Sequence, residues 1–171
     1  MPGKKTKRRS TKGADPFAVF KELVVAAFHD EKVHAGFAKI FADVPSELRG
    51  ARPEGQPFTL WQLLEHLRLC VLDFLDSCRV PGYVEPKFPE GYWPASDTPA
   101  SNQEWEQSVR EFRSSLRTLE KLLLNPSNDL VSVIPGSNGR TALRQALACL
   151  DHNAYHLGQA VLLRRLLGIW E

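Results

Sequence analysis

The stretch Thr141–Gly168, TALRQALACLDHNAYHLGQAVLLRRLLG, decides the fold class. Its apolar residues recur every three or four positions, which places them on one face of an α-helix. Thr141 is a suitable N-cap, and Gly168 is typical of the position just after a helix. A helix with one apolar face must pack against other elements. The expected helix runs through Leu143, Leu147, Leu150, Ala154, Leu157, Val161 and Leu166 to Gly168.

Three earlier segments show the same helical periodicity. The first starts at Asp15-Pro16, where Asp caps the helix and Pro fits its first position, and its apolar pattern continues to residue 41. Gly36 interrupts that pattern without ending it. The second helix is expected over Thr59–Arg79. The third opens with the capping box of Ser101–Glu104 and continues to about residue 125.

The connections predict how these helices are arranged. Residues 45–57 form a loop, and residues 80–100 contain five prolines and no regular element. A connection of this length can cross a bundle, so the second and third helices can run parallel. Residues 125–140 form the last connection, with a short strand expected at 130–134. We therefore predict an all-α fold: a four-helix bundle with a long crossover connection between helices 2 and 3.

Length, composition and charge indicate one globular domain. The chain has 171 residues, of which 43% are hydrophobic and 25% charged, and no apolar run is long enough for a transmembrane helix. Residues 1–14 are expected to be a basic disordered tail, and residues 15–171 the bundle domain. The tail carries six lysines and arginines and no acid, so the remainder has 16 basic and 20 acidic residues. That negative remainder makes nucleic acid an unexpected partner; for the tail we favour a solvated segment over contact with nucleic acid or anionic lipid.

Cysteine usage favours a reducing compartment. The chain has three cysteines, Cys70, Cys78 and Cys149, an odd and sparse set that does not resemble a disulfide scaffold. The basic start is not followed by the apolar stretch of a secretory signal. We therefore expect a cytoplasmic protein without a membrane partner.

Three histidines are candidate metal ligands. His152 and His156 stand four residues apart, so they project from one face of the last helix, and His66 lies among leucines of the second helix. Buried imidazoles need partners, and one cation shared by three rings would supply them. Ordinary hydrogen-bonded histidines explain the spacing equally well. A site that combines these histidines with Cys70 or Cys149 as a ligand is also geometrically possible, although a buried cysteine more often serves as a small apolar side chain in the core.

Three segments resemble the DinB-like (damage-inducible, YfiT-type) family. They are FTLWQLLEHLR at 58–68, PEGYWP at 89–94 and DHNAYHLGQ at 151–159, in that order along the chain. The resemblance covers about residues 16–170. It implies a four-helix bundle with a long connection between its second and third helices. It also implies a divalent transition metal held by one histidine of the second helix and two of the fourth, here His66, His152 and His156.

The resemblance implies a metal more firmly than a reaction. Some relatives are transferases or isomerases that activate a low-molecular-weight thiol on the metal, many have no known reaction, and members often pair as homodimers. Three neutral imidazoles leave at least one coordination position open, as in catalytic sites. Zinc and nickel are the leading candidates for the ion.

Further residues are expected around this site. In each ligand, the ring nitrogen that faces away from the metal needs a hydrogen-bond partner that orients the ring. The candidates are Asp73, seven residues after His66, and Gln159, three residues after His156. His34 on the first helix is a further polar or acid–base candidate, although a hydrogen bond between helices explains it more simply. Tyr92 and Trp93 are candidate cavity walls in a lid over the metal; packing against the bundle side is the simpler alternative.

Three functional hypotheses follow. The first is a metal-dependent enzyme, a hydrolase or thiol transferase, that acts on an unidentified small-molecule substrate. The second is a non-catalytic metal-binding protein of stress response, sensing or sequestration. The third is a structural bundle whose histidines are ordinary core groups. We favour the first, because an open metal position is typical of catalysis.

Overall fold

Helices account for the regular structure of the described chain. The computed structural model describes residues 15–171, so the predicted tail over 1–14 lies outside the described residues. Within this range no helix combines the length and apolar character needed to cross a membrane. Five α-helices and one 3-10 helix are present: α1 (Pro16–Ala27), α2 (Phe37–Phe41), η1 (Ser46–Leu48), α3 (Leu60–Arg79), α4 (Asn102–Leu124) and α5 (Ala142–Leu166).

The three longest helices begin where side chains cap their first turn. The Thr59 hydroxyl accepts a hydrogen bond from the backbone N–H of Gln62, whose side chain accepts the N–H of Thr59, each at 3.1 Å. Ser101 caps α4 and Thr141 caps α5 through equivalent contacts. These caps satisfy N–H groups that have no partner within the helix. The predicted starts of all three helices are therefore confirmed.

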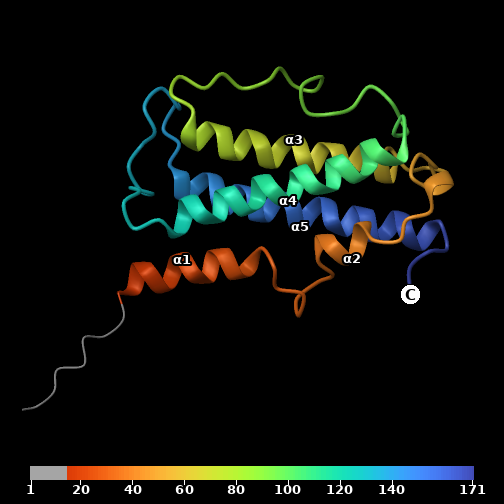
Figure 1. Ribbon diagram of the computed structural model, residues 1–171, viewed down its shortest axis with the longest axis horizontal. Coiled ribbons are helices and arrows are strands. Elements are labelled where there is room, and N and C mark those ends of the chain that lie inside the picture. Colours follow the sequence, from red (N-terminus) through yellow and green to blue (C-terminus); the bar gives the residue numbers. More distant parts are fainter. Residues whose placement is uncertain (1–14) are drawn as a thin grey trace, which may run out of the picture.

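The long connection crosses the bundle, and α3 and α4 run parallel (Figure 1). Residues 80–100 return along the length of the molecule from the end of α3 to the start of α4. There the Thr59 hydroxyl donates to the Asp97 carbonyl at 2.7 Å, which ties the start of α3 to the residues just before α4. Near the middle of both helices, Arg68 of α3 pairs with Glu111 of α4 at 3.1 Å. The predicted crossover is confirmed.

The core lies between the three long helices. Helices α1 and α5 run opposite to α3 and α4 (Figure 1), and α1 packs on α4 and α5. Large side chains from each layer are almost completely buried. They include Leu63 and Leu64 of α3, Trp105, Phe112 and Leu119 of α4, and Ala146 and Leu163 of α5.

The first helix is shorter than predicted. A continuous helix over residues 15–41 is wrong, because α1 ends at Ala27 and α2 begins only at Phe37. Between them the Asp30 carboxylate accepts the backbone N–H of Lys32 at 3.0 Å, which forms a local turn in place of the helical ladder. Gly36 then starts α2 with an extended backbone. The apolar pattern persists because Ile40 and Phe41 are still buried in the core.

The expected strand at residues 130–134 does not form. The described residues contain one isolated bridge there, between Val133 and Thr141, and no strand. The Asp129 carboxylate accepts the N–H groups of Val131 and Ser132 at 3.0 Å, which folds this segment into a turn. A strand needs an extended partner along its length, whereas in residues 15–171 the contacts of this segment with the start of α5 are the bridge to Thr141 and a hydrogen bond from the N–H of Leu143 to the Leu130 carbonyl.

A buried arginine joins α5 to α2 and to the C-terminal segment. Only 7% of Arg164 is exposed. Its guanidinium donates to the carbonyl oxygens of Ile40 and Ala42 at 2.6 and 2.8 Å, and to Ile169 at 2.9 Å. Carbonyls at a helix C-terminus attract a cation, so the contact is favourable. The short α2 is thereby held against the bundle.

We expect Arg164→Ala to lower the free energy of unfolding by about 2–4 kcal/mol, because it leaves several buried carbonyls without a donor. Urea denaturation followed by circular dichroism measures this. The neighbouring Arg165 is exposed, so Arg165→Ala should change stability by less than about 0.5 kcal/mol. Equal losses in the two variants would contradict the role of Arg164.

Candidate metal centre

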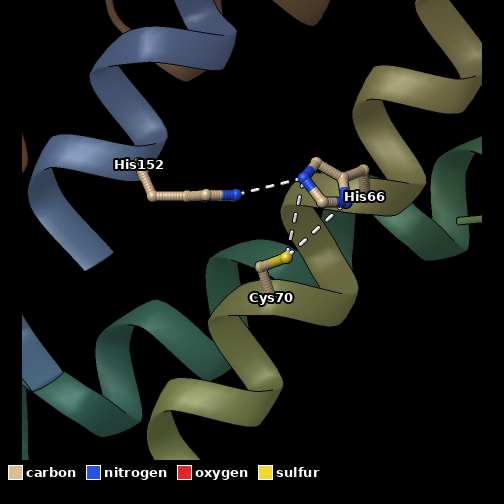
Figure 2. A group of neighbouring side chains, drawn as sticks. All are labelled: His66, Cys70 and His152. Carbon is tan, nitrogen blue, oxygen red and sulfur yellow. Dashed lines mark hydrogen bonds between the residues drawn. The ribbon is translucent and has the colours of Figure 1, made fainter. Parts of the chain in front are cut away.

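Three imidazoles converge between α3 and α5. The Nε2 atom of His66, on α3, lies 3.1 Å from Nε2 of His152 and 3.1 Å from Nε2 of His156, both on α5. The two α5 histidines are one turn apart, so both face α3. Figure 2 shows the His152 ring pointing edge-on at Nε2 of His66. The structure thus brings together the three histidines predicted as ligands.

The outer nitrogens of two of these rings are held by oxygen acceptors. Nδ1 of His66 donates to the backbone carbonyl of Tyr92 at 2.8 Å, and Nδ1 of His156 donates to the side-chain oxygen of Gln159 at 2.7 Å. A carbonyl oxygen can only accept, so each Nδ1 carries the hydrogen of the neutral ring. In both rings Nε2 is therefore left with a bare lone pair.

These lone pairs face one another. His66 and His156 present acceptor nitrogens 3.1 Å apart, so this contact is not a hydrogen bond when both rings are neutral. At most one of the two contacts made by His66 Nε2, the one to His152, can be a hydrogen bond. A cation placed among the three nitrogens would convert the unfavourable contact into coordination. Outer partners of this kind are also the usual way in which metal-binding histidines are oriented.

A proton does not substitute for that cation at neutral pH. Burial lowers the pKa of His66 to about 4, against the smaller upward effect of its hydrogen bond to Tyr92. Burial also lowers the pKa of His152 to about 4, helped by the two neighbouring histidines, and lowers that of His156. The rings are therefore neutral, which is the form that binds a metal.

The outer nitrogen of His152, Nδ1, differs from those of the other two rings. This atom is buried and has no hydrogen-bond partner among residues 15–171, and the same holds for Oδ1 of the adjacent Asn153. The Asn153 side chain raises the pKa of His152, as an acceptor at a ring N–H does, although burial outweighs it. Asn153 was not predicted from the sequence. A carboxamide directly after a candidate ligand was the available signal.

Cys70 lies beside the histidines on the next turn of α3. Its sulfur is 3.6 Å from Nδ1 and 3.8 Å from Nε2 of His66, so it sits alongside the ring (Figure 2). One ligand atom from each of His66, Cys70 and His152 lies within 4.8 Å of the others, a group that could hold a metal ion. Burial raises the pKa of the thiol to about 12, so without a cation it is protonated. Cys149 is fully buried and accepts a weak contact from Asn153.

The crossover connection covers the histidines. The Trp93 indole stacks on the His66 ring with centroids 3.8 Å apart and planes 5° apart. Phe58 stacks in turn on the Trp93 indole, with centroids 4.1 Å apart. Tyr92 contributes its backbone carbonyl to His66. Trp93 thus forms a wall of the cluster, while Tyr92 acts through its main chain.

Among the other predicted site residues, Gln159 contacts the histidine cluster, whereas Asp73 and His34 do not. Asp73 accepts a hydrogen bond from the Tyr83 hydroxyl at 2.7 Å, which fastens the crossover connection to α3. Burial, followed by this contact with Asp73, raises the pKa of Tyr83. His34 is exposed in the turn before α2, where Nδ1 contacts the Ala35 carbonyl at 3.1 Å. That turn exists because the first helix breaks.

We expect the stability of the EDTA-treated protein to fall as the pH drops from 6.5 toward 4. In this window unfolded histidines bind protons that the folded His66 and His152 exclude, so protonation favours unfolding. Urea denaturation at several pH values measures the slope. The slope should be shallower in His152→Gln and unchanged in His34→Gln. Equal slopes in the wild type and His152→Gln would contradict this assignment.

Comparison with models of known protein families identifies the family of this chain. The family model described as the DinB superfamily matches residues 29–160, most of the chain, and the matched span includes all three clustered histidines. Searches of curated proteins and of solved structures found no significant match. The resemblance carried by the three sequence segments is thereby confirmed: the chain belongs to the DinB superfamily.

Proposed function

We propose that this protein binds one divalent transition metal ion, zinc or nickel, through Nε2 of His66, His152 and His156. One observation carries the proposal: two bare Nε2 lone pairs face each other at 3.1 Å while oxygen acceptors hold both outer nitrogens. Ordinary core histidines would be expected to point a donor at each acceptor, because an unsatisfied buried polar group costs about 1–3 kcal/mol. Neutral imidazole is a favoured ligand of both metals.

The surrounding residues would hold the three rings in place. The Tyr92 carbonyl and Gln159 fix the tautomers of His66 and His156. Nδ1 of His152 and Oδ1 of the adjacent Asn153 are both buried and without a partner in the described chain, so a small rotation of Asn153 would let its oxygen accept from this ring. Trp93 restricts the His66 ring by stacking on its face. Such outer contacts typically change metal affinity by about 10–100-fold. The protein would thus offer a site organised before the ion arrives.

We further propose that the site is catalytic, in a hydrolase or thiol transferase. Three protein ligands leave a coordination position open for a water molecule or a low-molecular-weight thiol. A bound divalent ion supplies Lewis acidity, which makes such a ligand a nucleophile at neutral pH. Trp93 would offer an apolar wall to a small-molecule substrate beside that position. Residues acting directly on a substrate are not assigned.

Cys70 supports a second candidate function. If its sulfur joins the three histidines, the ion has four protein ligands and the site is closed, as in structural or sequestering zinc sites. The position of Cys70 beside His66 and His152 is the observation that favours this alternative. The protein would then bind metal in stress response without turnover.

Cytoplasmic location and a homodimer complete the proposal. All three cysteines are free, as in proteins of a reducing compartment. Two side chains of α1, Phe20 and Leu23, are 40% and 63% exposed, so α1 offers apolar surface to a second copy. We expect neither a membrane nor a nucleic acid as a partner.

Elemental analysis of the untagged protein should find about one zinc or nickel ion per chain, and His152→Ala should lose it, because two rings alone hold a metal weakly. A chelator should lower the melting temperature of the wild type, since the ion binds only the folded chain.

The matched control is His34→Ala, which removes an exposed histidine and should keep the metal. If His152→Ala does not fold, His156→Gln provides the second test. Absence of metal in the wild type, even after incubation with zinc or nickel, together with a melting temperature that chelators do not change, would favour a purely structural bundle.

Cys70→Ala separates the open site from the closed one. For an open three-histidine site, zinc affinity should change by less than about tenfold, because only packing beside the ring is lost. For a closed site, affinity should fall by more than about 100-fold. Competition titration with a zinc indicator measures this, and the cobalt-substituted protein should lack thiolate-to-metal charge-transfer absorption if the site is open. Cys78→Ala is the control.

A further inference from the structure

A second cavity lies on the other side of α5 from the histidines. It has a volume of about 380 Å³, within the range of small-molecule sites. Residues on a helix turn by about 100° each, so Leu150, Ala154 and Leu157, which line the cavity, face away from His152 and His156. No residue of α3 lines it. The cavity is therefore separate from the candidate metal centre.

The walls of this cavity are largely apolar and come from three parts of the chain. Helix α4 contributes Phe112 and Leu116, and Phe37 of α2 stacks on Phe112 with ring centroids 3.8 Å apart. The turn between α1 and α2 closes the remaining side. This opening exists because the first helix breaks at residue 28, which lets the chain bend away from α4 and α5.

Two positive charges stand at the exposed part of the cavity. Arg113 and Arg117 line it, are one turn apart on α4, and are both exposed. Neither forms an ion pair within the described chain, whereas Arg68 on the opposite side of the bundle pairs with two carboxylates. Arg113 also lies 5.9 Å from the centre of the Phe37 ring. Apolar walls thus meet unpaired guanidinium groups.

One carboxylate also lines the cavity. Glu31 belongs to the turn between α1 and α2, and its side chain lies against Gly36, where a Cβ atom would come within 2.5 Å of Oε1. It stands on the turn rather than on α4, and it makes no ion pair with either arginine among residues 15–171. An anion beside the arginines would be attracted by two charges and repelled by one.

We propose that this cavity binds an organic carboxylate with an apolar body, of the size of a medium-chain fatty acid. The chain of the ligand lies in the cavity against the stacked Phe37 and Phe112 rings and Leu157. Its carboxylate is held by Arg113 and Arg117, which suit planar anions. None of the three clustered histidines lines the cavity, although Asn153, the neighbour of His152, does. The proposal therefore does not require a bound metal.

Isothermal titration with decanoate, below its micelle concentration, tests the proposal in the presence of EDTA. The wild type should bind saturably. Arg113→Gln/Arg117→Gln should weaken binding by about tenfold, since each partly solvated ion pair contributes modestly. Glu31→Gln should strengthen binding, because it removes the repulsive charge. Arg144→Gln, an exposed arginine away from the cavity, is the control and should bind as the wild type does.

Two further measurements locate the site. Ala154→Phe fills the cavity and should abolish binding if circular dichroism shows the variant folded. 1-Decanol, the neutral analogue, should bind more weakly than decanoate. The proposal is overturned if the wild type shows no saturable binding, if the double arginine variant binds unchanged, or if binding requires the metal. Decanoate binding that persists in His152→Ala would support a site distinct from the metal centre.

Discussion

Both nitrogens of a buried imidazole need partners, and this requirement organises the centre of the bundle. The outer nitrogens of His66 and His156 are satisfied by Tyr92 and Gln159, which commits their inner nitrogens to lone pairs aimed at one another. Packing of α3 against α5 brings those lone pairs to 3.1 Å. The interior therefore holds an arrangement that is unfavourable by itself and suited to a cation.

The crossover connection is part of this arrangement. Parallel α3 and α4 require the chain to return along the length of the bundle, as residues 80–100 do (Figure 1). Its Tyr92 carbonyl and Trp93 indole contact His66, while Tyr83 is fastened by Asp73. A short hairpin between the two helices would have left His66 without its outer acceptor. The topology and the metal-site proposal thus depend on the same connection, residues 80–100.

Local sequence predicted the elements well wherever capping and periodicity agreed. Thr59, Ser101 and Thr141 start helices as expected, because each hydroxyl satisfies an N–H of its own first turn. The prediction was wrong at residues 28–36, where the apolar pattern continues although Asp30 and Gly36 break the helix. It was also wrong at 130–134, where β-branched residues suggested a strand with no partner to pair with. Periodicity reports which side chains are buried, not whether the backbone between them stays helical.

The sequence by itself determined the three long helices, the length of the connection between α3 and α4, and the four-residue spacing of His152 and His156, since these depend on spacing within single segments. Only the tertiary structure decided which outer nitrogen has which partner. The spacing within one helix does not predict that the acceptor for His66 is the carbonyl of Tyr92, 26 residues away. It also does not predict that Asp73 accepts a hydrogen bond from Tyr83 and not from a histidine. The position of Cys70 of α3 close to His152 of α5 likewise comes from the packing of the two helices. Contacts between elements depend on how the helices rotate and slide against each other, which local periodicity does not encode.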